Sequence, residues 1–157
     1  MLEKLSENFY AKDAITVAKQ LLGKVIVHEL DGNFIMSQIT ETESYCGIED
    51  KGCHAYGNKR TQRTETMYQK GGTAYVYLIY GMYDCFNVVT GLKDDPQAVL
   101  IRGARPFGDA DILSFNRFNK KYSDISNYQK RNVLNGPGKF CRAMKITRQQ
   151  NDLDLCN

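Results

Sequence analysis

Thr73-Ala74-Tyr75-Val76-Tyr77-Leu78-Ile79-Tyr80-Gly81-Met82-Tyr83 is the stretch that decides most of the fold. Tyr75 and Tyr77 alternate with apolar residues, as a half-buried strand requires. A turn follows, and residues 85–90 are predicted to form the returning strand of a β-hairpin. The tyrosine rings could pack into a hydrophobic core, or they could stack on a nucleic-acid base and fill the gap that it leaves. The stretch alone is compatible with both interpretations.

Antiparallel strands are predicted on both sides of this hairpin. Residues 24–30 and 33–43 flank Asp31-Gly32, a dipeptide typical of tight hairpin turns. Residues 98–102 form a further predicted strand, which ends near Arg105-Pro106-Phe107-Gly108. Strands joined by hairpins, with few helices between them, predict an α+β fold with a mainly antiparallel sheet. We expect this sheet to be open and barrel-like, with peripheral helices and a protruding tyrosine-rich hairpin.

Helices and loops fill the intervals between the strands. Asp13 is typical of a helix N-cap, and the helix that it starts should run to residue 22. The apolar stripe predicted for this helix is Ile15, Ala18, Leu21 and Leu22. Further helices are predicted at residues 110–118 and 139–144. Residues 46–72 are expected to be a polar loop with one or two short helices, and residues 119–132 a flexible loop.

Length and composition predict one folded domain over residues 1–157, since 42% of the residues are apolar. The five cysteines have no paired spacing, which indicates a reducing compartment. The sequence also has no leader-like apolar start and no run long enough to span a membrane. We therefore expect a protein that is not secreted, in the cytoplasm at a bacterial nucleoid or in a eukaryotic nucleus. Residues 101–157 hold eleven Lys/Arg against five Asp/Glu, a basic surface that either faces phosphate or is simply solvated.

The sequence also excludes several kinds of site. The chain has two histidines, His28 and His54, and Cys53-His54 lacks two further ligands at suitable spacing, so no metal site is predicted. The zinc-deaminase pattern is absent. Neither G-x-x-x-x-G-K-[ST] nor G-x-G-x-x-G occurs, so the sequence predicts no binding site for nucleoside triphosphates or dinucleotides. No cofactor is predicted.

Two acids on one predicted strand are the first catalytic candidates. Glu41 and Glu43 share a face about 6.6–6.8 Å apart along the strand. That spacing suits glycosidic cleavage, as in a carbohydrate hydrolase, but also an ordinary solvent face. Glu43, Tyr45 and His54 form a better cluster, because they could supply a base, a stacking face and a hydrogen-bond partner.

Several segments, taken in order, resemble one family closely. They run from Ile39-Thr40-Glu41-Thr42-Glu43-Ser44-Tyr45 through residues 50–54, the tyrosine stretch, Asn87 and Val99-Leu100-Ile101-Arg102 to Gly136-Pro137-Gly138-Lys139. Together they look like the alkyladenine (3-methyladenine) DNA glycosylases of the mammalian type, over residues 18–144. The resemblance implies a monofunctional enzyme of base excision repair. Such an enzyme flips alkylated or deaminated purines (3-methyladenine, 7-methylguanine, hypoxanthine or ethenoadenine) from duplex DNA and hydrolyses the N-glycosidic bond.

The resemblance also implies roles for single residues. Glu43 matches the carboxylate that activates the attacking water, and Arg102 matches the residue beside that water. Tyr80 and Met82 match the wedge that enters the vacated base stack. The implied partner is double-stranded DNA that contains damaged purines, bound by a monomer with no membrane involved.

The same resemblance implies a base-binding pocket. Tyr45 and Tyr77 match the rings that sandwich the flipped base, and His54 matches the residue at its edge. Asn87 matches the residue that crowds the amino group of normal guanine. Rejection of guanine would then come from a steric clash.

Phosphate contacts are expected from a basic loop and from the last helix, through Arg60, Thr61, Arg63, Lys139 and Arg142. The chain also departs from the family pattern. Asp84 follows the wedge, Arg105 stands where an acid is usual, and the domain looks shortened at its C-terminus. A non-catalytic nucleic-acid-binding module of the same fold is therefore the alternative interpretation.

Overall fold

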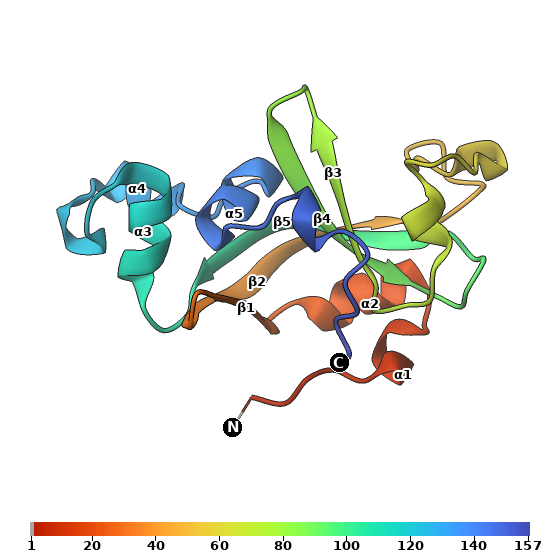
Figure 1. Cartoon of the computed structure of the whole chain (residues 1–157), viewed down its shortest axis with the longest axis horizontal. Helices are drawn as coiled ribbons and strands as arrows, with labels where there is room; N and C mark the ends of the chain where they lie inside the picture. The colour runs from red at the N-terminus through yellow and green to blue at the C-terminus, as the bar shows by residue number, and fades with distance from the viewer. Residues whose placement is uncertain (1) are drawn as a thin grey trace.

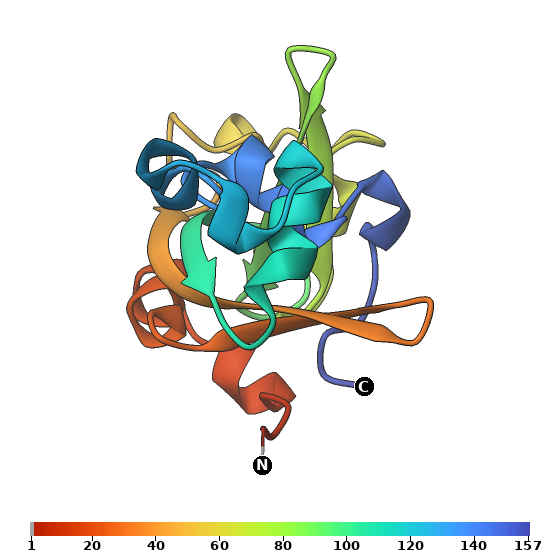
Figure 2. The ribbon, with the colours of Figure 1, turned by 90° about the vertical axis from the view of Figure 1, so that its left-hand side faces the viewer.

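The computed structural model describes residues 2–157 as a five-stranded antiparallel sheet with helices around it (Figure 1). The strand order is β1-β2-β5-β4-β3. The sheet curls into a half-barrel, and the tip of the β3–β4 hairpin projects beyond it (Figure 2). The strands are β1 (Val25–Leu30), β2 (Asn33–Tyr45), β3 (Ala74–Ile79), β4 (Tyr83–Thr90) and β5 (Gln97–Pro106). The predicted α+β class is confirmed.

Apart from its exposed tip, the β3–β4 hairpin is buried on both faces, because each face packs into a different core. Alternate side chains point to opposite faces of a strand. On β3, Ala74 and Val76 pack into a larger core with helix residues such as Phe140, while Tyr75 and Tyr77 pack into a smaller second core. The tyrosines are therefore core residues, and they also line the pocket described below.

The helices cover the sheet and close the larger core. Asp13 caps the first long helix as predicted, because its carboxylate accepts a hydrogen bond from the Thr16 backbone N–H. The helices are α1 (Glu7–Tyr10), α2 (Ala14–Leu21), α3 (Ala110–Phe118), α4 (Asn127–Arg131) and α5 (Pro137–Met144), with four short 3-10 helices, η1 (Tyr56–Asn58), η2 (Glu65–Tyr68), η3 (Tyr122–Asp124) and η4 (Arg148–Gln150). Among residues 2–157, none of these helices has both the length and the apolar content to cross a membrane.

Two details of the helix prediction were wrong. Ile15 and Leu22 are about half exposed (50% and 47%), because the buried stripe of α2 is Ala14, Val17, Ala18 and Leu21. That set has the i, i+3, i+4, i+7 spacing of one helix face. The predicted loop at 119–132 contains η3 and α4, because Ser126 and Gln129 form a reciprocal capping box that starts a helix there.

The hairpin turns follow from residues that tolerate a positive φ. Asp31 and Gly32 have φ of 51° and 76°, which suits a type I′ turn. Tyr80 and Gly81 have φ of 53° and 68°, and the Met82 N–H donates to the Ile79 carbonyl across the turn. A tyrosine rarely adopts this conformation, so the fold places Tyr80 at the tip against its backbone preference.

The C-terminal segment runs alongside β3 and covers part of that edge of the sheet. The Asp152 N–H donates to the Ala74 carbonyl, and the Ala74 N–H donates to the Leu153 carbonyl. The Asn151 side chain accepts from the Val76 N–H at 2.9 Å. This segment therefore fixes the strand that carries Tyr75 and Tyr77, and it reduces the exposed edge available for unwanted pairing.

Candidate active site

Glu43 and Arg102 meet across the β2–β5 pair. Arg102 Nη1 donates to Glu43 Oε2 at 2.7 Å, and the Tyr45 hydroxyl donates to Glu43 Oε1 at 2.7 Å. Arg102 Nε lies 3.4 Å from Glu41 Oε1, so one guanidinium contacts both acids. Both oxygens of Glu43 are thus held, which fixes the direction in which this carboxylate points.

An irregularity in the sheet places Arg102 opposite these acids. Glu41 pairs with Gly103 and Thr42 with Ile101, so Arg102 is the extra residue of a β-bulge. The N–H of Gly136, just before α5, donates to the Arg102 carbonyl at 2.8 Å and supports the bulge. Bulges redirect side chains beside functional sites. Here the bulge turns Arg102 toward Glu43.

Aromatic and amide side chains line a small cavity next to this pair. The lining residues are Tyr45, Gly52, His54, Met67, Tyr75, Tyr77, Asn87 and Ala98. All four pocket residues implied by the family resemblance are among them. The cavity measures about 10 Å³, which is room for one water molecule.

The aromatic residues of this cavity contact one another. The His54 and Tyr77 ring centroids are 4.6 Å apart, edge to face, and those of Tyr75 and Tyr77 are 5.3 Å apart. His54 Nδ1 lies 3.0 Å from the Tyr75 hydroxyl. The buried Asn87 amide donates to the main-chain carbonyls of Tyr75 and Cys85, so its side chain is fixed.

Burial sets the protonation states around the cavity. It raises the pKa of Tyr75 to about 12, and it raises the pKa of Tyr77 and, with the hydrogen bond to Glu43, that of Tyr45. These phenols therefore remain protonated. Burial, and then the charge of Arg63, lower the pKa of His54, which favours neutral imidazole at neutral pH. Burial disfavours the charge of Arg102, but Glu43 and Glu41 outweigh it and raise the pKa of its guanidinium.

The hairpin tip presents apolar side chains to solvent. Tyr80 is 83% exposed and Met82 is 63% exposed. They lie in the turn between β3 and β4, and this hairpin projects beyond the rest of the sheet (Figure 1). Both side chains are therefore accessible from outside the protein.

Comparison with known proteins identifies the family. A family model described as methylpurine-DNA glycosylase matches residues 8–157. This chain belongs to that family. It is 49% identical over 155 residues to a protein of Clostridium novyi (strain NT), 48% over 155 residues to one of Desulfitobacterium hafniense (strain Y51) and 47% over 151 residues to one of Clostridioides difficile (strain 630). All three have the name "Putative 3-methyladenine DNA glycosylase".

The similarity extends along nearly the whole chain. It covers 99%, 99% and 96% of the chain, and 77%, 76% and 75% of the three relatives. The chain is accordingly a DNA glycosylase, a DNA-repair enzyme that acts on DNA. Within residues 2–157 the structure has no group of three His, Cys, Asp or Glu side chains arranged to hold a metal ion.

The basic residues of this glycosylase fall into two groups. Lys139 and Arg142 line a hollow of about 330 Å³ beside the hairpin residue Tyr83, together with Arg117. Gly138 lets α5 approach Tyr83 closely, since a Cβ there would lie 2.8 Å from the ring. This hollow is open and positively charged, as a phosphate contact requires.

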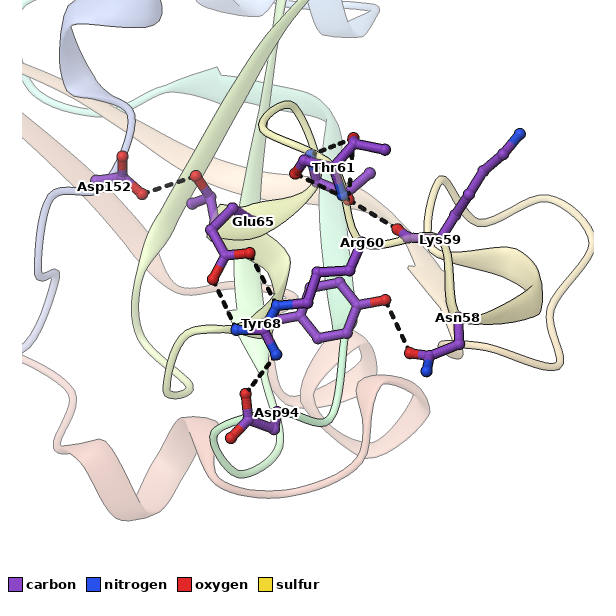
Figure 3. Close-up of polar contacts among 10 residues, drawn as sticks. Asn58, Lys59, Arg60, Thr61, Glu65, Tyr68, Asp94 and Asp152 are labelled. Atoms are coloured by element: carbon purple, nitrogen blue, oxygen red, sulfur yellow. Dashed lines mark hydrogen bonds and ion pairs between the residues drawn. The ribbon is translucent and has the colours of Figure 1, made fainter.

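In the second basic group, on the 59–65 loop, Arg60 is engaged within the protein. Arg60 forms ion pairs with Glu65 and Asp94 (Figure 3). The Thr61 N–H donates to the Thr64 hydroxyl. The Arg63 guanidinium carbon lies 5.6 Å from the Tyr77 ring centroid. Arg60 therefore has a structural contact that sequence alone did not predict.

The structure also shows the contacts of three residues to which the sequence assigned no role in the site. Tyr75 shares the pocket face with Tyr77, as its spacing of two residues in the strand would have indicated. Asp84 forms an ion pair with Arg148, with Oδ1 and Nε 3.7 Å apart. Arg105 donates to the Gln38 side chain at 2.6 Å. The sequence contains no signal for these long-range pairings.

Proposed function

We propose that this DNA glycosylase flips alkylated or deaminated purines out of duplex DNA and hydrolyses their N-glycosidic bond with a water activated by Glu43. The candidate substrates are 3-methyladenine, 7-methylguanine, hypoxanthine and ethenoadenine. One observation supports this most: Glu43 is hydrogen-bonded to a ring that lines the aromatic cavity and is oriented by Arg102. A carboxylate fixed in that way can aim a water at the sugar of a base held between the rings.

The proposed chemistry follows from this arrangement. Water attacks C1′ of the sugar, the C1′–N9 bond breaks, and its electron pair leaves with the base. Glu43 accepts the proton of the water and stabilises the positive charge that develops on the sugar. Arg102 holds the carboxylate in position and lies beside the water. The departing base takes up a proton from solvent if it leaves as an anion.

Base recognition would use the aromatic faces and the fixed amide. Tyr45 and Tyr77 would sandwich the base, and their faces attract a cationic alkylpurine by about 0.5–2 kcal/mol. His54 would contact the edge of the base. Asn87 would exclude guanine, because its side chain is tied to two carbonyls and cannot move away from the guanine amino group.

Entry of a base requires the cavity to open, because its present volume of about 10 Å³ is far smaller than a purine. Opening requires Tyr45 and Tyr77 to move apart. Tyr80, with Met82 beside it, would fill the vacated position in the base stack. Lys139 and Arg142 would contact DNA phosphates from the hollow beside the hairpin, while Thr61, Arg60 and Arg63 remain weaker candidates. We expect the enzyme to act as a monomer on double-stranded DNA.

The test is to incubate the protein with duplexes that contain one hypoxanthine or one 7-methylguanine, and with a matched undamaged duplex. Abasic sites are then revealed by alkaline strand cleavage. We expect cleavage at the lesion and none in the undamaged duplex. Binding to the lesion duplex without any abasic site would instead support a non-catalytic nucleic-acid-binding module.

A further inference from the structure

Arg63 belongs to a loop that is held closed by ion pairs. Arg60 donates to both oxygens of Glu65, through Nε at 2.8 Å and Nη2 at 2.7 Å. Its Nη1 donates to Asp94 at 2.8 Å, and its guanidinium carbon lies 4.5 Å from the centroid of the buried Tyr68 ring (Figure 3). A bidentate arginine stacked on a fixed ring has one well-defined geometry. We call Arg60 with its partners Glu65, Asp94 and Tyr68 the clamp. The clamp joins the two ends of the 60–65 segment and anchors them to the second core.

Hydrogen bonds within the segment restrict it further. The buried Thr64 hydroxyl donates to the Lys59 carbonyl at 2.8 Å, and the Thr61 N–H donates to that hydroxyl at 2.8 Å. The Thr64 and Glu65 N–H groups both donate to the Thr61 carbonyl. Arg63 lies inside this closed segment, so the clamp limits where its side chain can reach.

The position of Arg63 relates it to the base pocket. Its guanidinium carbon lies 5.6 Å from the Tyr77 ring centroid, and Tyr77 in turn contacts His54 and Tyr75. Its positive charge contributes to the lowered pKa of His54, which places it within electrostatic range of the pocket edge. Among residues 2–157, no carboxylate forms an ion pair with Arg63. An unneutralised cation thus lies beside the proposed base site.

We propose that Arg63 is a specificity-determining residue that favours release of neutral purine lesions over cationic ones. The inference rests on the proposed function. A neutral base such as hypoxanthine leaves with the electron pair of the broken C1′–N9 bond and becomes an anion, which a nearby cation stabilises. A 7-methylguanine base is positively charged before cleavage and leaves neutral. Arg63 repels that cation, and it also competes for the Tyr77 face.

The test compares single-turnover release of hypoxanthine and 7-methylguanine from otherwise identical duplexes at subsaturating enzyme, so that each rate includes binding of the base as well as its release. Arg63→Gln should slow hypoxanthine release by roughly three- to tenfold, the effect of one screened charge at this range. Release of 7-methylguanine should stay constant or become faster. The matched control is Lys59→Gln, which removes one positive charge from the same loop. The Lys59 side chain points away from the clamp (Figure 3), so this variant should leave the ratio of the two rates unchanged.

Asp94→Asn gives a second variant that keeps Arg63 itself. Loss of the Asp94 charge weakens the clamp, so the ratio should shift in the same direction as in Arg63→Gln, by a smaller factor. A phosphate-contacting Arg63 would behave differently: both subsaturating rates would fall by equal factors, so their ratio would not change, and the salt dependence of binding would become less steep. That result, or an unchanged ratio in Arg63→Gln, would overturn the inference alone. If the wild-type protein released neither base, the proposed function itself would fail.

Discussion

Replacement of Arg102 by Gln separates the positioning of Glu43 from the stability of the fold. In the present structure the Arg102–Glu43 ion pair has an N–O distance of 2.7 Å, and the two side chains are 40% and 41% exposed. Ion pairs this exposed contribute about 0.2–1 kcal/mol. Glu43 also keeps its hydrogen bond from Tyr45 in the variant. We therefore expect the free energy of unfolding to fall by less than about 1 kcal/mol.

The catalytic loss in Arg102→Gln should be much larger than this loss of stability. Glu43 would be held by one partner and could rotate away from the line to the sugar. Misplacement of a catalytic group by about 1 Å can reduce a rate by about 100-fold. We expect base release from a hypoxanthine duplex to slow by about 10- to 100-fold in single-turnover assays.

The two quantities are measured by urea unfolding and by single-turnover base release. Arg105→Gln is the matched control, because Arg105 lies on the same strand but contacts Gln38. The control should retain both stability and activity. The reasoning is refuted if Arg102→Gln releases base at the wild-type rate, or if it loses more than about 2 kcal/mol of stability, which would indicate a structural role.

Three further changes have defined outcomes. Asn151→Ala leaves the N–H of Val76 without its side-chain acceptor, so it should reduce the free energy of unfolding by about 1–3 kcal/mol in urea titrations. Tyr80→Asn should leave stability unchanged, because Tyr80 is 83% exposed and Asn tolerates its positive φ. The same variant should capture the flipped base more weakly, which the fluorescence of a base analogue in the lesion duplex would show. The pKa of His54 is lowered in the folded state, so the unfolded chain takes up that proton first as the pH falls. Stability should therefore decrease below about pH 6.5, and His54→Gln should show a smaller decrease.

Local patterns in the sequence predicted most of the sheet. The alternation around Tyr75 and the Asp31-Gly32 turn require only neighbouring residues, and the structure confirms both hairpins. The capping residue Asp13 likewise acts on the next turn of its own helix. These features were predictable because the residues that determine them lie close together in the sequence.

The features that were missed depend on contacts between distant segments. The bulge that turns Arg102 toward Glu43 arises from the pairing of two strands and from the segment before α5. Arg60 looked like a free phosphate contact, but Asp94, more than thirty residues away, binds it. The buried stripe of α2 was displaced because the orientation of a helix depends on the core that it covers. Neighbouring residues do not specify these pairings.

The most direct test of the central claim compares Glu43→Gln with Glu41→Gln. Both acids contact Arg102, and both substitutions remove one negative charge from the same strand. The measurement is the rate of abasic-site formation in a hypoxanthine duplex, with binding to the duplex measured in parallel. We predict that Glu43→Gln still binds the duplex but forms no abasic sites, while Glu41→Gln remains active. Equal rates of base release by Glu43→Gln and the wild-type protein would contradict the account.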